Sequence, residues 1–138
     1  MRRHFQLPEE DIIYLETLGL EWESIIDRGM HWVLIHNYPV PFGYNVQATT
    51  IAIKIETGYP RTGLDMAYFN PPLSRLDRKP INAICSQTVD NKLFQRWSRH
   101  RTSTNPWRAG LDDLSTHVSL ISFWFEQEFL KRANGIAA

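Results

Sequence analysis

Apolar residues recur at three- and four-residue steps near the end of the chain and predict a long amphipathic helix. The stripe consists of Leu111, Leu114, Val118, Ile121, Phe125 and Phe129. Asp112 and Asp113 occupy the first turn of this expected helix, where the helix dipole favours negative charge. We therefore expect about 22 helical residues beginning near Leu111.

A shorter helix and four strands are expected before this helix. Pro8 and the acidic residues that follow it favour a first helical turn, which predicts a helix over residues 8–18. Alternating or β-branched apolar runs between turn residues predict strands at residues 22–26, 30–38, 46–55 and 64–69. Their short connections indicate an antiparallel meander. Residues 70–96 show weak periodicity and contain Pro80, which predicts a long irregular connection.

This order of elements belongs to the α+β class. A chain of 138 residues suits one compact domain, so we expect a single domain over residues 1–138. No apolar run approaches the roughly 18 residues that a membrane-spanning helix requires. The N-terminal sequence also lacks the apolar centre of a signal peptide. We therefore expect a cytoplasmic protein.

Composition and charge argue against several functions. The chain has 15 Lys and Arg and 15 Asp and Glu, without the basic excess of a typical nucleic-acid-binding domain. Its one basic cluster consists of Arg96, Arg99, Arg101 and Arg108. Five histidines without close ligand spacing and a single cysteine do not suggest a metal site. Glycine-rich phosphate loops are missing from the sequence, so we expect no cofactor.

Several motifs resemble the ubiquitin-conjugating enzyme superfamily. Gly58-Tyr59-Pro60 and Asn70-Pro71-Pro72 resemble its Tyr-Pro turn and His-Pro-Asn loop, although Phe69 stands where that loop has its histidine. Trp107, shortly before the last helix, resembles the tryptophan that leads into the next helix of the family. Trp97-Ser98-Arg99-His100, together with Leu111-Asp112-Asp113-Leu114, resembles a prokaryotic branch, family E. The resemblance covers residues 7–132 and implies the ubiquitin-conjugating fold.

The same resemblance implies a function and partners. It implies a bacterial enzyme that receives a ubiquitin-like modifier from an activating enzyme and transfers it to an amine. A deconjugating metalloprotease from the same gene cluster is a further implied partner, and such clusters are associated with antiviral defence. Some superfamily members have lost the nucleophile and only bind ubiquitin-like proteins. The alternative is therefore a catalytically inactive binding module.

Two residues compete for the role of nucleophile. Cys85 is the only thiol, and the superfamily uses a cysteine thioester, but Cys85 precedes Trp107 by 22 residues. Counting the family's shorter spacing back from Trp107 leads to Ser98. His100 can serve as its general base. It lies two residues after Ser98, and on an extended strand side chains two residues apart point to the same face. We expect an oxyester on Ser98 first and a thioester on Cys85 second.

Further residues are assigned to the expected site. Asn70 is the first candidate to stabilise the oxyanion, and Asn91 and Asn105 are rivals. The residues expected to contact the modifier or another partner are Trp97, Arg99, Arg96, Asp112 and Asp113. The arginines suit carboxylates, while the two aspartates could act as an acid and base pair or simply compensate the helix dipole.

Overall fold

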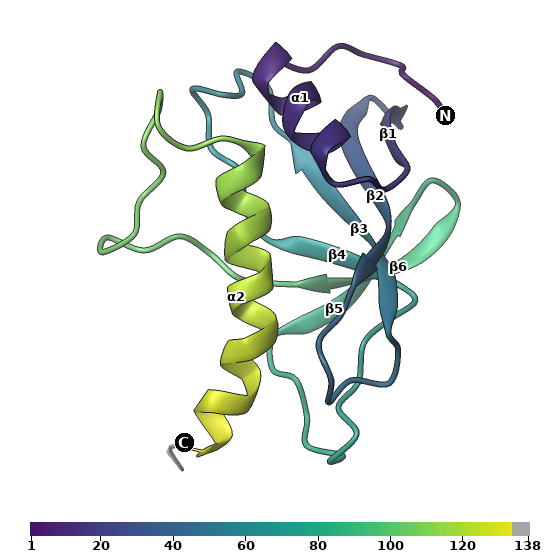
Figure 1. The fold of residues 1–138 in the computed structure, drawn as a ribbon, viewed down its shortest axis with the longest axis vertical. Helices are drawn as coiled ribbons and strands as arrows, with labels where there is room; N and C mark the ends of the chain where they lie inside the picture. Colours follow the sequence, from purple (N-terminus) through teal and green to yellow (C-terminus); the bar gives the residue numbers. More distant parts are fainter. Residues whose placement is uncertain (134–138) are drawn as a thin grey trace.

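A long helix lies across one face of a curled antiparallel sheet (Figure 1). The computed structural model describes residues 1–133, with side chains through Leu130. The helices are α1 (Glu9–Thr17) and α2 (Leu114–Ala133). The strands are β1 (Trp22–Asp27), β2 (Met30–Pro39), β3 (Ala48–Ile55), β4 (Ala67–Asn70), β5 (Ile84–Val89) and β6 (Lys92–Trp97). Their order across the sheet is β1-β2-β3-β4-β6-β5.

The α+β class, the first helix, the four-stranded meander and the long last helix are confirmed. The structure differs from prediction at residues 84–97, which we expected within an irregular connection. These residues form the β5–β6 hairpin around Asp90 and Asn91, whose φ angles are 54° and 60°. Asp and Asn tolerate this left-handed conformation, which two-residue hairpin turns require. The hairpin extends the sheet because β6 pairs with β4.

Helix α2 begins at Leu114, after the two aspartates that we placed in its first turn. Asp113 caps the helix: its Oδ1 accepts the N–H of Thr116 at 3.2 Å, and its own N–H donates to Thr116 Oγ1 at 3.0 Å. This reciprocal pair is a capping box. Asp11 of α1 also accepts the Leu114 N–H at 3.2 Å, so the two helices are joined at this end.

Two apolar clusters lie on opposite faces of the sheet. The main cluster fills the space between the sheet and the helices and includes Leu15, Val33, Phe69, Trp97 and Phe125. The second cluster, on the other face, consists of Ile25, Trp32, Leu34, Ala52, Tyr68, Val89 and Phe94. Strand alternation explains the division, since consecutive residues point to opposite faces.

Candidate functional site at the end of strand β6

Ser98 follows the last residue of β6, and backbone hydrogen bonds hold Ser98 and the next residue, Arg99, from opposite sides. The Ser98 N–H donates to the carbonyl of Ala83 at 2.9 Å, and the carbonyl of Arg99 accepts the N–H of Met66 at 3.0 Å. Ala83 and Met66 have φ angles of 56° and 59°. A left-handed conformation costs an ordinary residue about 1–2 kcal/mol, and such positions cluster at functional sites. The half-buried Ser98 and Arg99 therefore lie between two strained backbone positions.

His100 is bonded to a residue that the sequence did not suggest. Its Nδ1 lies 2.6 Å from Oδ2 of Asp65, in the loop before β4, and both side chains are partly exposed. Ser98 and His100 both follow β6 in a segment outside the strands, where the Arg99 N–H donates to the Trp97 carbonyl at 3.0 Å. None of the hydrogen bonds among the described residues joins Ser98 to His100, so the expected general-base pair shares a segment but not a direct bond.

Cys85 is an exposed free thiol on β5. It lies opposite Arg96 of β6, and the partner of Ser98 in the extended ladder is Ala83. Cys85 and Ser98 are therefore diagonal neighbours on one face of the hairpin, an arrangement with a typical separation of about 7–8 Å. Cys85 also borders a groove of about 310 Å³ beside Pro72. The rival nucleophiles thus belong to one surface region.

The three candidate oxyanion donors lie in different places. Asn70 ends β4, and its Nδ2 donates to the carbonyl of Leu93 at 2.9 Å, which uses one of its two N–H groups. Asn91 lies in the β5–β6 turn, at the opposite end of β6 from Ser98. Asn105 closes a turn with Thr102 in the segment before α2. Asn70 is the candidate beside the groove that contains Cys85.

Two of the expected contact residues are part of the packed interior of the site. Trp97 is completely buried in the main core. The Arg99 guanidinium donates to Glu128 Oε2 of α2 at 3.1 Å and to the Asn82 carbonyl at 3.0 Å, and it lies 4.9 Å from the Trp97 ring centroid. These contacts join the end of β6 to α2, so Trp97 and Arg99 support the position of Ser98 from the core side.

Arg96 and the two aspartates have separate environments. Arg96 lies opposite Tyr68 and Cys85 on the neighbouring strands, with its Nη1 3.4 Å from Gln87 Oε1. Asp112 is buried and accepts the Arg108 N–H at 2.8 Å. Burial opposes its ionisation, but this hydrogen bond and nearby arginines hold the pKa of Asp112 below its usual value. Asp112 thus fixes the segment that leads into α2, beside the Asp113 cap.

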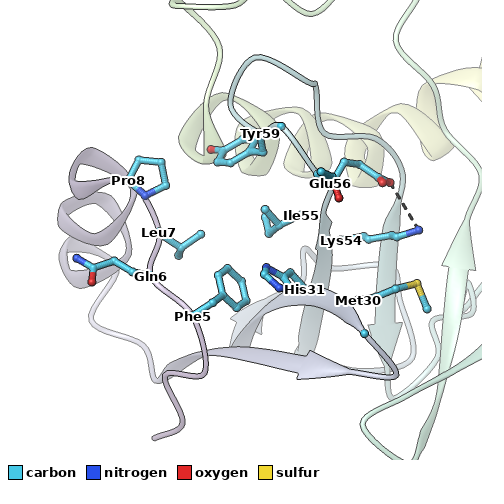
Figure 2. A pocket seen from close by; sticks show the side chains of 13 residues that line it. Phe5, Gln6, Leu7, Pro8, Met30, His31, Lys54, Ile55, Glu56 and Tyr59 are labelled. Atoms are coloured by element: carbon cyan, nitrogen blue, oxygen red, sulfur yellow. Dashed lines mark ion pairs between the residues drawn. The ribbon is translucent and has the colours of Figure 1, made fainter.

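Another pocket, of about 530 Å³, lies at the α1 end of the sheet (Figure 2). The N-terminal segment forms one wall, where Phe5 stacks on His31 with ring centroids 4.3 Å apart. The ends of β2 and β3 form the other, where Lys54 and Glu56 make an ion pair at 3.7 Å. Its lining contains none of the predicted site residues, so the chemistry expected from the sequence lies outside this pocket.

Sequence reasoning missed Asp65 because it is 35 residues from His100 along the chain. The contact depends on β4 pairing with β6, which brings the loop before β4 beside the segment after β6. The only signal in the sequence was a β-type run over residues 92–97, which would have placed these two segments together. Within the described residues, no three His, Cys, Asp or Glu side chains are grouped to hold a metal ion.

The order of elements is a helix, an antiparallel meander and a long final helix, and the candidate nucleophiles lie beyond the fourth strand. This arrangement is that of the ubiquitin-conjugating class. The sequence model of prokaryotic E2 family E matches residues 7–128, and the chain belongs to this family. No curated protein and no solved structure matches it. Helices in the described part of the chain are all too short or too polar to cross a membrane. Family membership supports a ubiquitin-conjugating-like role in general.

Proposed function

We propose that this protein accepts a ubiquitin-like modifier from an activating enzyme in the cytoplasm, carries it as an ester on Ser98, and transfers it to an amine. The setting of Ser98 is the observation that supports this most. Ala83, bonded to the Ser98 N–H, and Met66, bonded to the next residue, are both left-handed. His100, which a carboxylate holds at 2.6 Å, follows two residues after Ser98. A serine hydroxyl needs such a base to become nucleophilic.

The chemistry requires two acyl transfers. Ser98 Oγ attacks the carbonyl carbon of the thioester that joins the modifier to the activating enzyme. The carbon–oxygen bond forms, the carbon–sulfur bond breaks, and the serine proton passes through His100 to the departing thiolate. An acceptor amine then attacks the ester, an amide forms, and the Ser98 hydroxyl is regenerated.

Cys85 is the second candidate for the carrier residue. Its thiol is exposed and free, and the groove that it borders lies beside the loop that follows Asn70. A thioester on Cys85 would transfer the modifier to an amine in the same way. Because Ser98 and Cys85 share a face of the hairpin, a modifier tail could reach either residue. The chemical stability of the adduct therefore has to distinguish the two carriers.

A reconstitution with the activating enzyme, the modifier and ATP tests the proposal. We expect an adduct that survives thiol reductant and is cleaved by hydroxylamine. Ser98→Ala should abolish it, and Cys85→Ala should leave it intact. Ser86→Ala, an exposed serine on the same hairpin, is the matched control and should also leave it intact.

Other outcomes are equally informative. An adduct that reductant cleaves and Cys85→Ala removes would replace the oxyester with a thioester. Wild-type protein that binds the modifier but never forms a covalent adduct would overturn the enzymatic proposal in favour of a binding module.

A further inference from the structure

We propose that Asp65 is a positioning residue that holds His100 as a base toward Ser98; this inference rests on the function proposed above. The Asp65 carboxylate lies 2.6 Å from His100 Nδ1. Asp65 comes from the loop before β4, and His100 comes from the segment after β6. A contact between two such segments requires the β4–β6 pairing of the folded sheet.

The main chain beside Asp65 is fixed on two sides. The N–H of the next residue, Met66, donates to the Arg99 carbonyl at 3.0 Å, which joins it to the segment that carries His100. The Met66 carbonyl accepts a hydrogen bond from Nε2 of His117 in α2, at 2.8 Å. His117 is completely buried. Asp65 is thus anchored to both the core helix and the candidate site.

The side chain of Asp65 has one hydrogen-bond partner among the described residues. Its Oδ2 contacts His100, while its Oδ1 is shielded from solvent and has no partner within the described part of the chain. An ionised carboxylate can only accept hydrogen bonds. His100 Nδ1 must therefore carry the hydrogen in this contact.

This contact determines the chemical state of the other ring nitrogen. In a neutral imidazole only one nitrogen carries hydrogen, so Nε2 of His100 has a free lone pair. That nitrogen can take the proton of Ser98 as its oxygen bonds to the thioester carbonyl and can return it to the leaving thiolate. The Asp65 carboxylate accepts the Nδ1 hydrogen bond of the transient imidazolium and stabilises it, as the carboxylate does in a serine–histidine–aspartate triad.

A simple surface ion pair is the competing explanation. The His100 and Asp65 side chains are 62% and 42% exposed, and exposed pairs contribute only about 0–1 kcal/mol to stability. Both explanations require hydrogen on His100 Nδ1, so they differ in the rate of ester formation. A surface pair would leave that rate unchanged.

Nitrogen NMR of the isotope-labelled protein tests the contact without any partner. Neutral wild-type His100 should show hydrogen on Nδ1. In Asp65→Ala it should shift toward the Nε2–H form that free histidine side chains prefer. Wild-type protein with hydrogen on Nε2, or no change in Asp65→Ala, would overturn the proposal.

The reconstituted reaction tests the catalytic consequence. Asp65→Asn, which can donate a hydrogen bond to Nδ1 and invert the ring state, should slow ester formation on Ser98 by about tenfold or more. Asp65→Glu should restore part of the rate. Glu56→Gln removes another partly exposed carboxylate that is paired with a cation, and it should leave the rate unchanged.

The results separate failure of this inference from failure of the proposed function. If wild-type protein forms the ester and Asp65→Asn forms it equally fast, the positioning role of Asp65 is wrong and the proposed function stands. If wild-type protein forms no ester on Ser98, both fail, whatever the NMR spectra show.

Discussion

At the scale of one residue, burial in the core keeps the imidazole ring of His117 neutral. Its ring is completely buried in α2 and lies 5.8 Å from the Trp124 ring, edge to face. Burial lowers its pKa from 6.5 to about 4. The ring is therefore neutral at pH 7, and its Nε2 must carry hydrogen because it contacts the Met66 carbonyl.

The pKa of His117 predicts a pH-dependent stability. In the unfolded chain the His117 ring is protonated below pH 6.5, whereas in the folded chain it stays neutral down to about pH 4. Stability should therefore fall as the pH falls through this window, by about 2 kcal/mol between pH 7 and pH 5. His117→Gln should remove this decrease, at the cost of lower stability at pH 7. Urea unfolding at both pH values measures it.

Ser119→Ala, an exposed position on the same helix, is the control for this prediction. It should keep the full difference between the two pH values. If His117→Gln keeps the difference as well, the pH dependence originates elsewhere and the neutral buried state of His117 is incorrect.

At the scale of one element, the β5–β6 hairpin depends on its two-residue turn. Asp90 and Asn91 both have positive φ angles. A β-branched residue is strained in this conformation, so Asn91→Val should destabilise the protein by about 1–2 kcal/mol. Asn91→Gly relieves the constraint and should stay within about 0.5 kcal/mol of wild type. Urea unfolding midpoints at pH 7 check both variants; equal midpoints would contradict the left-handed turn.

The same hairpin shows what the sequence could and could not predict. The last helix and the four-stranded meander were predictable because their apolar residues repeat with a helical or strand period. Residues 84–89 are mostly exposed on both faces, so they lack the apolar alternation that identifies a half-buried strand. The candidate site, too, could be predicted only in part. Ser98 and His100 lie in one short motif, whereas Asp65 joins them only through strand pairing.

At the scale of the whole molecule, the sheet curls until the hairpin tip meets the N-terminal segment. Arg2 connects them: its guanidinium donates to Glu23 Oε1 in β1 at 2.8 Å and to Asp90 Oδ2 at the hairpin tip at 2.7 Å. The Asp90 N–H also donates to Asp27 Oδ2 at 3.2 Å. The backbone of Arg3 pairs with Ser24 and covers the edge of β1. These contacts join β1, at one edge of the sheet, to the hairpin at the other edge.

This closure predicts a specific acid sensitivity. Glu23 is buried, and the hydrogen bonds from Arg2 and His36 lower its pKa from 4.5 to about 2, although burial opposes the shift. The folded chain therefore keeps Glu23 ionised where the unfolded chain protonates it. The stabilisation is complete well above pH 4.5 and is lost as the pH falls toward 2. Between pH 4.5 and pH 3 it should decrease by about 1.5 kcal/mol.

Glu23→Gln tests whether this carboxylate holds the curled sheet closed. The variant should be less stable than wild type at pH 6, because the charge-assisted bonds to Arg2 and His36 are lost. It should then lose less stability than wild type between pH 4.5 and pH 3, as urea unfolding at each pH would show. Glu21→Gln removes an exposed carboxylate just before β1 and should behave as wild type. Because Arg2 also holds Asp90, Arg2→Ala should reproduce the Glu23→Gln profile. A wild-type acid profile in Arg2→Ala would mean that the hairpin tip is held independently of the N-terminal segment.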